Sequence, residues 1–275
     1  MRKSKDNDKR NNAGRINVLE SFLSQERGGR EQCALHSREC SLRTLIVLAL
    51  ETTEKFGSVA MLAGQTVLDE RQLPNDRRSS QTLHPAIQSL FQQTRTKPAS
   101  VDVVVVVVGP GSFTGLRVGV TAAKVFAYLT GAKIFPMDTF RTVAAAMSSH
   151  TGMISVGVDA QRGEVIAAVL QRTASGQITM IREPALMSVD LWRQHADLHD
   201  NVLFAGPALE RWSGEAKPNL LLADKPDWQP KASVAGKLAV DQIRSGQFVD
   251  AFSLQPSYSR LSAAEEKWAK EKWTK

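Results

Sequence analysis

The sequence predicts a layered α/β protein in which one structural plan occurs twice. Six consecutive valines at residues 103–108 are typical of a central strand that helices cover on both faces, because this uniform β-branched run has no polar side. The strand runs into a glycine-rich segment, residues 109–119, where Pro110 ends the strand and the glycines permit a tight turn into a helix. The order of strands and helices predicted for residues 44–150 recurs in residues 151–275.

The first half is predicted to contain three strands, a helix, the valine strand, a second helix and a fifth strand. The three opening strands lie at residues 45–50, 56–62 and 66–72, and turns separate them. Ser79 or Ser80 would cap the first helix, in which apolar residues recur at helical spacing. The second helix covers residues 115–129, and the last strand covers residues 132–136.

The second half repeats this order less regularly. Its strands are predicted at residues 153–158, 165–170, 177–182 and 202–205, and its helices at residues 188–198 and 233–243. The first strand of each half ends at an acidic residue, Glu51 in one and Asp159 in the other. Two copies of a β-β-β-α-β-α order predict two actin-like (ribonuclease-H-like, ASKHA) lobes, and in that fold the two acids face each other across a cleft. For either acid alone, a solvated turn residue is the alternative.

The predicted domains follow from this repeat. Residues 44–150 form the first lobe, with helices that bind a partner, and residues 151–275 form the second lobe and a C-terminal tail. Residues 1–43 are polar and hold ten Lys/Arg and six Asp/Glu. The net charge of this segment is therefore +4, which is more than half of the +7 of the whole chain. They are expected to be a disordered extension, or the result of a start codon assigned too early; an RNA-binding arm is the alternative.

Cysteine content and hydropathy indicate the compartment. The two cysteines, Cys33 and Cys40, lie outside the predicted core, which fits a reducing cytoplasm. No apolar stretch approaches the roughly 20 residues that cross a bilayer, so we expect a soluble cytoplasmic protein without a membrane partner.

The glycine-rich segment is a candidate anion site. A strand that ends at a helix N-terminus presents free N–H groups and the positive end of the helix dipole. The candidate residues for a nucleotide or for the cleft between the lobes are Glu51, Gly111, Ser112, Arg117 and Asp159. The glycine spacing matches neither a P-loop nor a Rossmann motif. As an alternative, the glycines only let the helix pack closely on its sheet.

Arg117 has three roles open to it. It could form a salt bridge across a subunit interface, reach a phosphate at the junction between subunits, or pair with a carboxylate such as Glu51.

Three segments resemble the TsaB proteins of the TsaD/TsaB (glycoprotease-like) family: residues 107–119, residues 159–165 and residues 256–268. Their order and spacing agree over about residues 44–268. The resemblance implies a role in the bacterial machinery that forms threonylcarbamoyladenosine in tRNA, beside the anticodon. It further implies a non-catalytic subunit that forms a heterodimer with TsaD, is joined by the ATPase TsaE, and meets tRNA through the complex. No cofactor of its own is implied, although ATP or ADP could lie at the junction.

The resemblance also identifies what the chain lacks. The catalytic paralogue holds a metal with two histidines after the strand that matches residues 132–136, and those positions are Asp138 and Thr142 here. Hard oxygen groups cannot replace two imidazoles, so no metal site and no catalytic residue are expected. His195 and His199 have the spacing of zinc ligands, but they lack the glutamate of His-Glu-x-x-His, and we expect exposed polar side chains there.

The two helices of the first lobe are the predicted partner interface, because the one over residues 115–129 is apolar nearly all round. The interface residues are Leu83, Ile87, Leu90, Phe91, Leu116, Val120, Ala123 and Ala127. Val118, Val125 and Leu129 lie on other faces of the second helix, and burial of the whole set within the lobe is the alternative. The same surface predicts a homodimer when the partner is absent.

Two other functions remain open. One is an enzyme of the actin-like class, either a small-molecule kinase or a metal-dependent hydrolase; the other is an ATP-binding chaperone-like module. The sequence assigns no role to residues 212–230.

Overall fold

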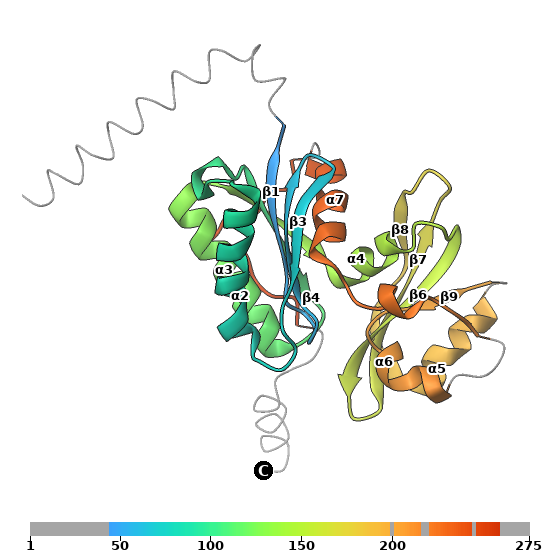
Figure 1. Cartoon of the computed structure of the whole chain (residues 1–275). Helices are drawn as coiled ribbons and strands as arrows, with labels where there is room; N and C mark the ends of the chain where they lie inside the picture. Colours follow the sequence, from blue (N-terminus) through green and yellow to red (C-terminus); the bar gives the residue numbers. More distant parts are fainter. Residues whose placement is uncertain (1–43, 199–200, 216–219, 244–245, 259–275) are drawn as a thin grey trace, which may run out of the picture. The chain divides into compact units, whose positions relative to one another are not determined.

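The computed structural model describes residues 44–198, 201–215, 220–243 and 246–258 (Figure 1). The described residues from Leu45 onward belong to one compact unit. The predicted extension, with Cys33 and Cys40, lies outside the described residues, as do His199 and the end of the third segment that carries the resemblance.

The first sheet has the predicted strands in the order β3-β2-β1-β4-β5. The strands are β1 (Ile46–Glu51), β2 (Ser58–Ala63), β3 (Thr66–Gln72), β4 (Val103–Gly109) and β5 (Lys133–Asp138). The valine strand β4 lies between β1 and β5, parallel to both. Its valines alternate between two cores: Val104 and Val106 belong to one, and Val103, Val105 and Val107 to the other. The prediction of a central strand covered on both faces is confirmed.

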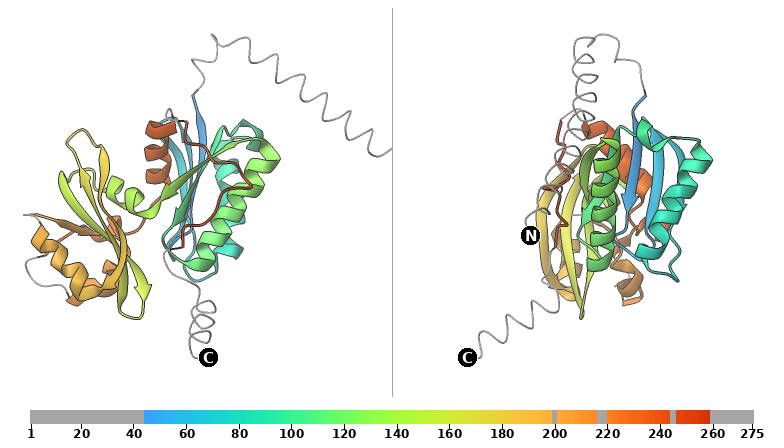
Figure 2. Two further views of the ribbon diagram at one scale, coloured as in Figure 1. Left: turned by 180° about the vertical axis from the view of Figure 1, so that it is seen from behind. Right: turned by 90° about the vertical axis from the view of Figure 1, so that its left-hand side faces the viewer.

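Helices cover the two faces of this sheet. On one face lie α2 (Ser79–Thr94) and α3 (Phe113–Thr130), side by side in both views of Figure 2. On the other face lies α7 (Ala232–Gln242). Helix α2 begins at Ser79 without a side-chain cap, so the predicted serine cap is wrong. Helix α3 begins at Phe113, earlier than predicted, because the Ser112 hydroxyl accepts the Gly115 N–H at 3.3 Å and caps it.

The second sheet repeats the topology of the first, in the order β10-β9-β6-β7-β8. Its strands are β6 (Gly152–Gln161), β7 (Glu164–Arg172), β8 (Ile178–Ser188), β9 (Leu203–Ala205) and β10 (Leu221–Leu222). When strands are numbered within each half, both sheets have the order third, second, first, fourth, fifth. The predicted duplication and the α/β two-lobe fold are confirmed.

Shorter helices complete the second half. They are α5 (Val189–Arg193), η3 (Gln194–Leu198), α6 (Leu209–Trp212), η4 (Ser213–Glu215) and η5 (Lys225–Asp227); in the first half, η2 (Pro98–Ser100) precedes β4. Ser188 caps α5 as predicted, by accepting the Leu191 N–H at 3.2 Å. None of the helices in the described ranges is both long enough and apolar enough to cross a membrane.

The last helix of each half packs in the core of the other half. Helix α4 (Thr139–Ala146) brings Phe140 and Val143 into the core of the second sheet. Helix α7, predicted to belong to the second lobe, instead packs on the first sheet through small residues such as Ala235 and Gly236. A Cβ at Gly236 would lie 2.5 Å from a methyl of Leu62, so the glycine lets α7 pack closely on the sheet. The predicted boundary at residue 151 therefore does not separate the two cores.

The chain after α7 stays with the first sheet. Val249 forms a β-bridge with Ile134 of β5, and Leu254 is buried in the core beneath α2 and α3. Ser257 N–H donates to the Val108 carbonyl at 2.7 Å. Residues 246–258, called the return segment below, can be followed in red in Figure 2.

Candidate functional site

The glycine-rich segment packs against the turn that follows β1. Ser112 N–H donates to the Thr53 carbonyl at 2.6 Å, and the Thr52 hydroxyl donates to the Gly115 carbonyl at 2.8 Å. A Cβ at Gly115 would overlap the Thr52 carbonyl oxygen, and one at Gly119 would overlap the Thr52 hydroxyl. The glycines thus permit close packing of α3 on this turn, which is what the alternative interpretation expects. The structure brings Glu51, Gly111 and Ser112 together at this junction.

Replacing Gly115 with alanine should lower the free energy of unfolding by about 2 to 3 kcal/mol, because overpacking displaces backbone here and not a flexible side chain. Urea denaturation would measure the loss. Gly214→Ala is the matched control, since nothing lies within 4 Å of a Cβ built there, and its effect should stay within about 0.5 kcal/mol. Equal stabilities of the two variants would show that the helix can move away from the turn without cost.

Glu51 is a buried acid. Its Oε1 accepts two hydrogen bonds from Thr53, from the N–H and from the hydroxyl, both at 2.5 Å. Its Oε2 is buried and has no hydrogen-bond partner among the described residues. Burial raises the pKa of Glu51 to about 8 against the opposing effect of the bonds from Thr53. The carboxyl is therefore mainly protonated at pH 7, and in that form it is a poor ligand for a cation.

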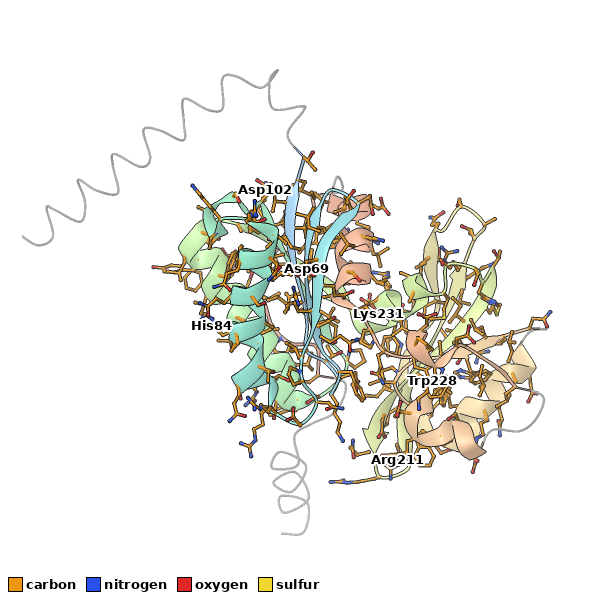
Figure 3. All side chains as sticks on the ribbon, in the orientation of Figure 1. Asp69, His84, Asp102, Arg211, Trp228 and Lys231 are labelled. Carbon is orange, nitrogen blue, oxygen red and sulfur yellow. The ribbon has the colours of Figure 1, made fainter. Side chains whose placement is uncertain are left out.

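Asp159 is bound within its own half. It accepts the Gln161 N–H at 2.9 Å and lies 3.5 Å from Arg211, which Figure 3 labels. Glu54, which no sequence motif suggests, is half-buried and interacts electrostatically with both predicted acids. Burial raises the pKa of Glu54 to about 8, with further contributions from the charges of Glu51 and Asp159. No motif marks Glu54, since it lies in an ordinary polar turn.

The positions that hold a metal in the catalytic paralogue serve here to begin a helix. Asp138 Oδ1 accepts the Arg141 N–H at 2.7 Å and caps α4, and its carboxylate lies 3.6 Å from the Arg141 guanidinium. Thr142 is buried and donates to the Asp138 carbonyl at 2.8 Å. In the part of the chain that the structure describes, no three metal-binding side chains form a group that could hold an ion.

His195 was predicted to be exposed, and this prediction is wrong. It is buried, and its Nδ1 lies 2.9 Å from the Ser155 hydroxyl, which also accepts the Trp192 indole N–H at 2.9 Å. Burial, with a smaller effect from the charge of Arg182, lowers the pKa of His195. The pair of Ser155 and His195 belongs to the core of the second sheet.

The predicted partner interface is largely inside the first lobe. Six of its eight residues are at most 6% exposed, and they are Leu83, Leu90, Leu116, Val120, Ala123 and Ala127. The other two, Ile87 and Phe91, are half-buried against the same core. The prediction that these side chains form a docking surface is therefore wrong for the six, because they line the face of each helix that covers the sheet.

Helix α3 exposes a different set of apolar side chains. Val125 is 53% exposed, Tyr128 is 73% exposed and Leu129 is 75% exposed. Phe252 of the return segment, 80% exposed, lies edge-on to Tyr128 with ring centroids 6.3 Å apart. A groove of about 450 Å³ lies beside Tyr128 and Phe252. These four residues are called the outer α3 surface below.

Arg117 lies on the same helix and does not pair with Glu51. Its Nε donates to the Tyr258 hydroxyl at 2.9 Å, and its guanidinium lies 4.0 Å from the centre of the Phe113 ring.

Comparison with known proteins identifies the family. Residues 67–210, more than half of the chain, match the family model described as TsaD: tRNA N6-adenosine threonylcarbamoyltransferase. The chain belongs to the TsaD family. Two curated members that it resembles are named tRNA threonylcarbamoyladenosine biosynthesis protein TsaB. The one from Bacillus subtilis is 27% identical over 82% of this chain and 98% of its own length. The one from Escherichia coli is 25% identical over 79% of this chain and 96% of its own length.

Solved structures agree on the fold. A Pseudomonas aeruginosa protein described as similar to peptidase YEAZ superposes with a TM-score of 0.68 at 20% identity, over 78% of this chain and all of its own. YeaZ from the same organism superposes with a TM-score of 0.66 at 21% identity, over 78% of this chain and 99% of its own. The predicted resemblance to TsaB within the TsaD family is confirmed.

Proposed function

We propose that this chain is the TsaB-type subunit of the complex that forms N6-threonylcarbamoyladenosine in tRNA, and that it activates TsaD without catalysing the reaction itself. Its TsaD-family sequence together with the two curated relatives supports the pathway. The observation that carries the non-catalytic role is the state of Asp138 and Thr142. Both side chains are engaged in starting α4, where the catalytic paralogue has its metal-binding histidines.

The predicted nucleotide cleft offers little to a catalytic reaction. Glu51 is mainly protonated at pH 7, and the turn of Thr52 and Thr53 packs against the glycine segment. These features support a chain that binds no cofactor of its own, with ATP or ADP at the junction to TsaD.

The outer α3 surface is the docking site that this function requires. Its four apolar side chains are exposed on the first lobe, and the groove beside Tyr128 could accept a side chain of the partner. We assign this surface to TsaD, with TsaE and tRNA joining through the complex in the cytoplasm. In the absence of TsaD the surface can pair with a second copy of the chain.

Reconstitution tests the proposal. Purified chain, TsaD, TsaE, ATP, threonylcarbamoyl-adenylate and tRNA are mixed, and the modified nucleoside is measured with and without this chain. We expect the modification to fall when the chain is omitted and to stay low when heat-denatured chain replaces it. Undiminished modification would refute the subunit role. Zinc retained by the isolated chain after dialysis, or phosphoryl transfer to a small substrate, would favour an enzyme instead.

A further inference from the structure

Arg117 shares one face of α3 with the outer α3 surface. Residues spaced by three or four positions along a helix lie on the same side, and Arg117 leads through Thr121 and Val125 to Tyr128 at this spacing. Arg117, Thr121, Val125 and Tyr128 are all exposed. The helix therefore presents a stripe that is cationic near its N-terminal end and apolar near its C-terminal end.

The Arg117 side chain is held in one orientation by two aromatic residues. Its guanidinium carbon lies 4.0 Å from the centroid of Phe113 and 5.9 Å from that of Tyr258, and the two rings are 4.8 Å apart. The bond from Nε to the Tyr258 hydroxyl, at 2.9 Å, uses one donor of the guanidinium. Its two Nη groups have no acidic partner among the residues that the structure describes. A side chain already ordered in this way loses less conformational entropy when it binds.

The first lobe itself fixes the residue that holds Arg117. Tyr258 ends the described part of the return segment, and the preceding Ser257 bonds to the end of β4 at 2.7 Å. Leu254, three residues earlier, is 2% exposed. The position of Tyr258 is therefore set before any partner arrives.

Together, the two helices α2 and α3 carry positive but no negative side chains. Neither α2 nor α3 contains an aspartate or glutamate, and α3 carries two cations, Arg117 and Lys124. The Lys124 ammonium donates to the Phe252 carbonyl at 3.5 Å, whereas Arg117 presents the donors of its Nη groups in a rigid fork. A planar guanidinium fork matches a carboxylate with two parallel hydrogen bonds.

We propose that Arg117 receives a carboxylate of TsaD and is the polar anchor of the interface at the outer α3 surface, with Tyr258 and Phe113 as its positioning residues. The inference rests on the proposed function, because it assigns this surface to TsaD. It adds the chemistry that the partner must supply: an apolar surface that carries an acidic side chain opposite Arg117.

The test measures the affinity of the full-length chain for purified TsaD by isothermal titration calorimetry, at low and at high salt. Arg117→Gln should weaken binding by about 30-fold or more, since truncating one member of a buried charge pair leaves the other unpaired. Arg117→Lys should recover only part of this loss, because an ammonium cannot form the fork. Lys237→Gln, an exposed lysine on α7, is the charge-matched control and should leave the affinity unchanged.

A double-mutant cycle tests the positioning role of Tyr258. Tyr258→Phe keeps the ring and removes the hydroxyl, and it should weaken binding by about threefold to tenfold. In the Arg117→Gln background the same change should have no further effect, which a merely structural role would not produce. Thermal melts of each variant check that the chain stays folded.

The outcomes separate this inference from the proposed function. If the parent chain binds TsaD and Arg117→Gln binds equally well, the anchor is refuted and the subunit role stands. If the parent chain does not bind TsaD, the proposed function fails. If Arg117→Gln weakens binding of tRNA to the isolated chain and leaves TsaD binding unchanged, Arg117 contacts a phosphate and the carboxylate partner is refuted.

Discussion

Leu129→Asp should abolish the association of this chain with TsaD, and with it the modification of tRNA, while the monomer keeps its stability. The Leu129 side chain is 75% exposed, so a carboxylate in its place remains hydrated in the free chain. In the complex the same carboxylate would be desolvated on an apolar surface without a counter-charge, which should weaken binding by about 100-fold or more. Calorimetric titration against TsaD and the reconstituted assay would measure both effects.

Leu191→Asp provides the matched control. Leu191 is 49% exposed on α5, in the second half of the chain, and the same substitution there should change neither binding nor modification. Two results would contradict the assignment of the surface to TsaD. One is full binding by the Leu129 variant, and the other is an equal loss in both variants.

The helices of the proposed interface were predictable from the sequence, but the face that they expose was not. Residues 115–129 are apolar nearly all round, so helical periodicity offers several faces and does not say which one covers the sheet. The orientation depends on Gly115 and Gly119, which bring one side of α3 against Thr52. That contact joins residues more than 60 positions apart, and local pattern carries no information about it.

The succession of strands along the chain was predicted in both halves, apart from β10, whereas the exchange of helices was not. Each strand corresponds to a short apolar segment between turns, which the sequence shows directly. Because the plan is duplicated, the strands of one half also help to identify those of the other. Helix α7 packs on the first sheet through contacts between distant residues, such as Gly236 with Leu62 and Ala49. The apolar pattern of a helix does not indicate which of the two sheets the helix covers. Residues 232–258 were therefore predicted to belong to the second lobe, although they pack with the first.

The sequence identified candidate site residues by their residue type, but the protonation state of the acids depends on how the fold buries them. An acid at the end of a strand predicted Glu51, but the complete burial of its carboxyl and its two bonds from Thr53 are properties of the folded chain. Glu54 carries no comparable signal, and its raised pKa arises because the fold leaves it half-buried near other acids.

Burial of Glu51 should make the stability of this protein depend strongly on pH. The folded chain holds the Glu51 proton with a pKa of about 8, compared with an ordinary value of 4.5. Stability from this difference is complete below pH 4.5 and is lost as the pH rises to about 8, because the unfolded chain releases its proton first. Glu51→Gln removes the titration, since the amide is neutral throughout and can still accept the bonds from Thr53.

The unfolding free energy of Glu51→Gln should therefore increase relative to that of the parent as the pH rises. Between pH 5 and pH 8, the difference in unfolding free energy between Glu51→Gln and the parent should move by about 3 to 4 kcal/mol in favour of the variant. Urea denaturation at several pH values measures this difference directly, whatever the absolute cost of burying the amide. Glu183→Gln, at an exposed position on β8, should give a curve parallel to that of the parent. A parallel curve for Glu51→Gln as well would mean that Glu51 is ionised in the folded chain, and the neutral acid beside the glycine segment would have to be abandoned.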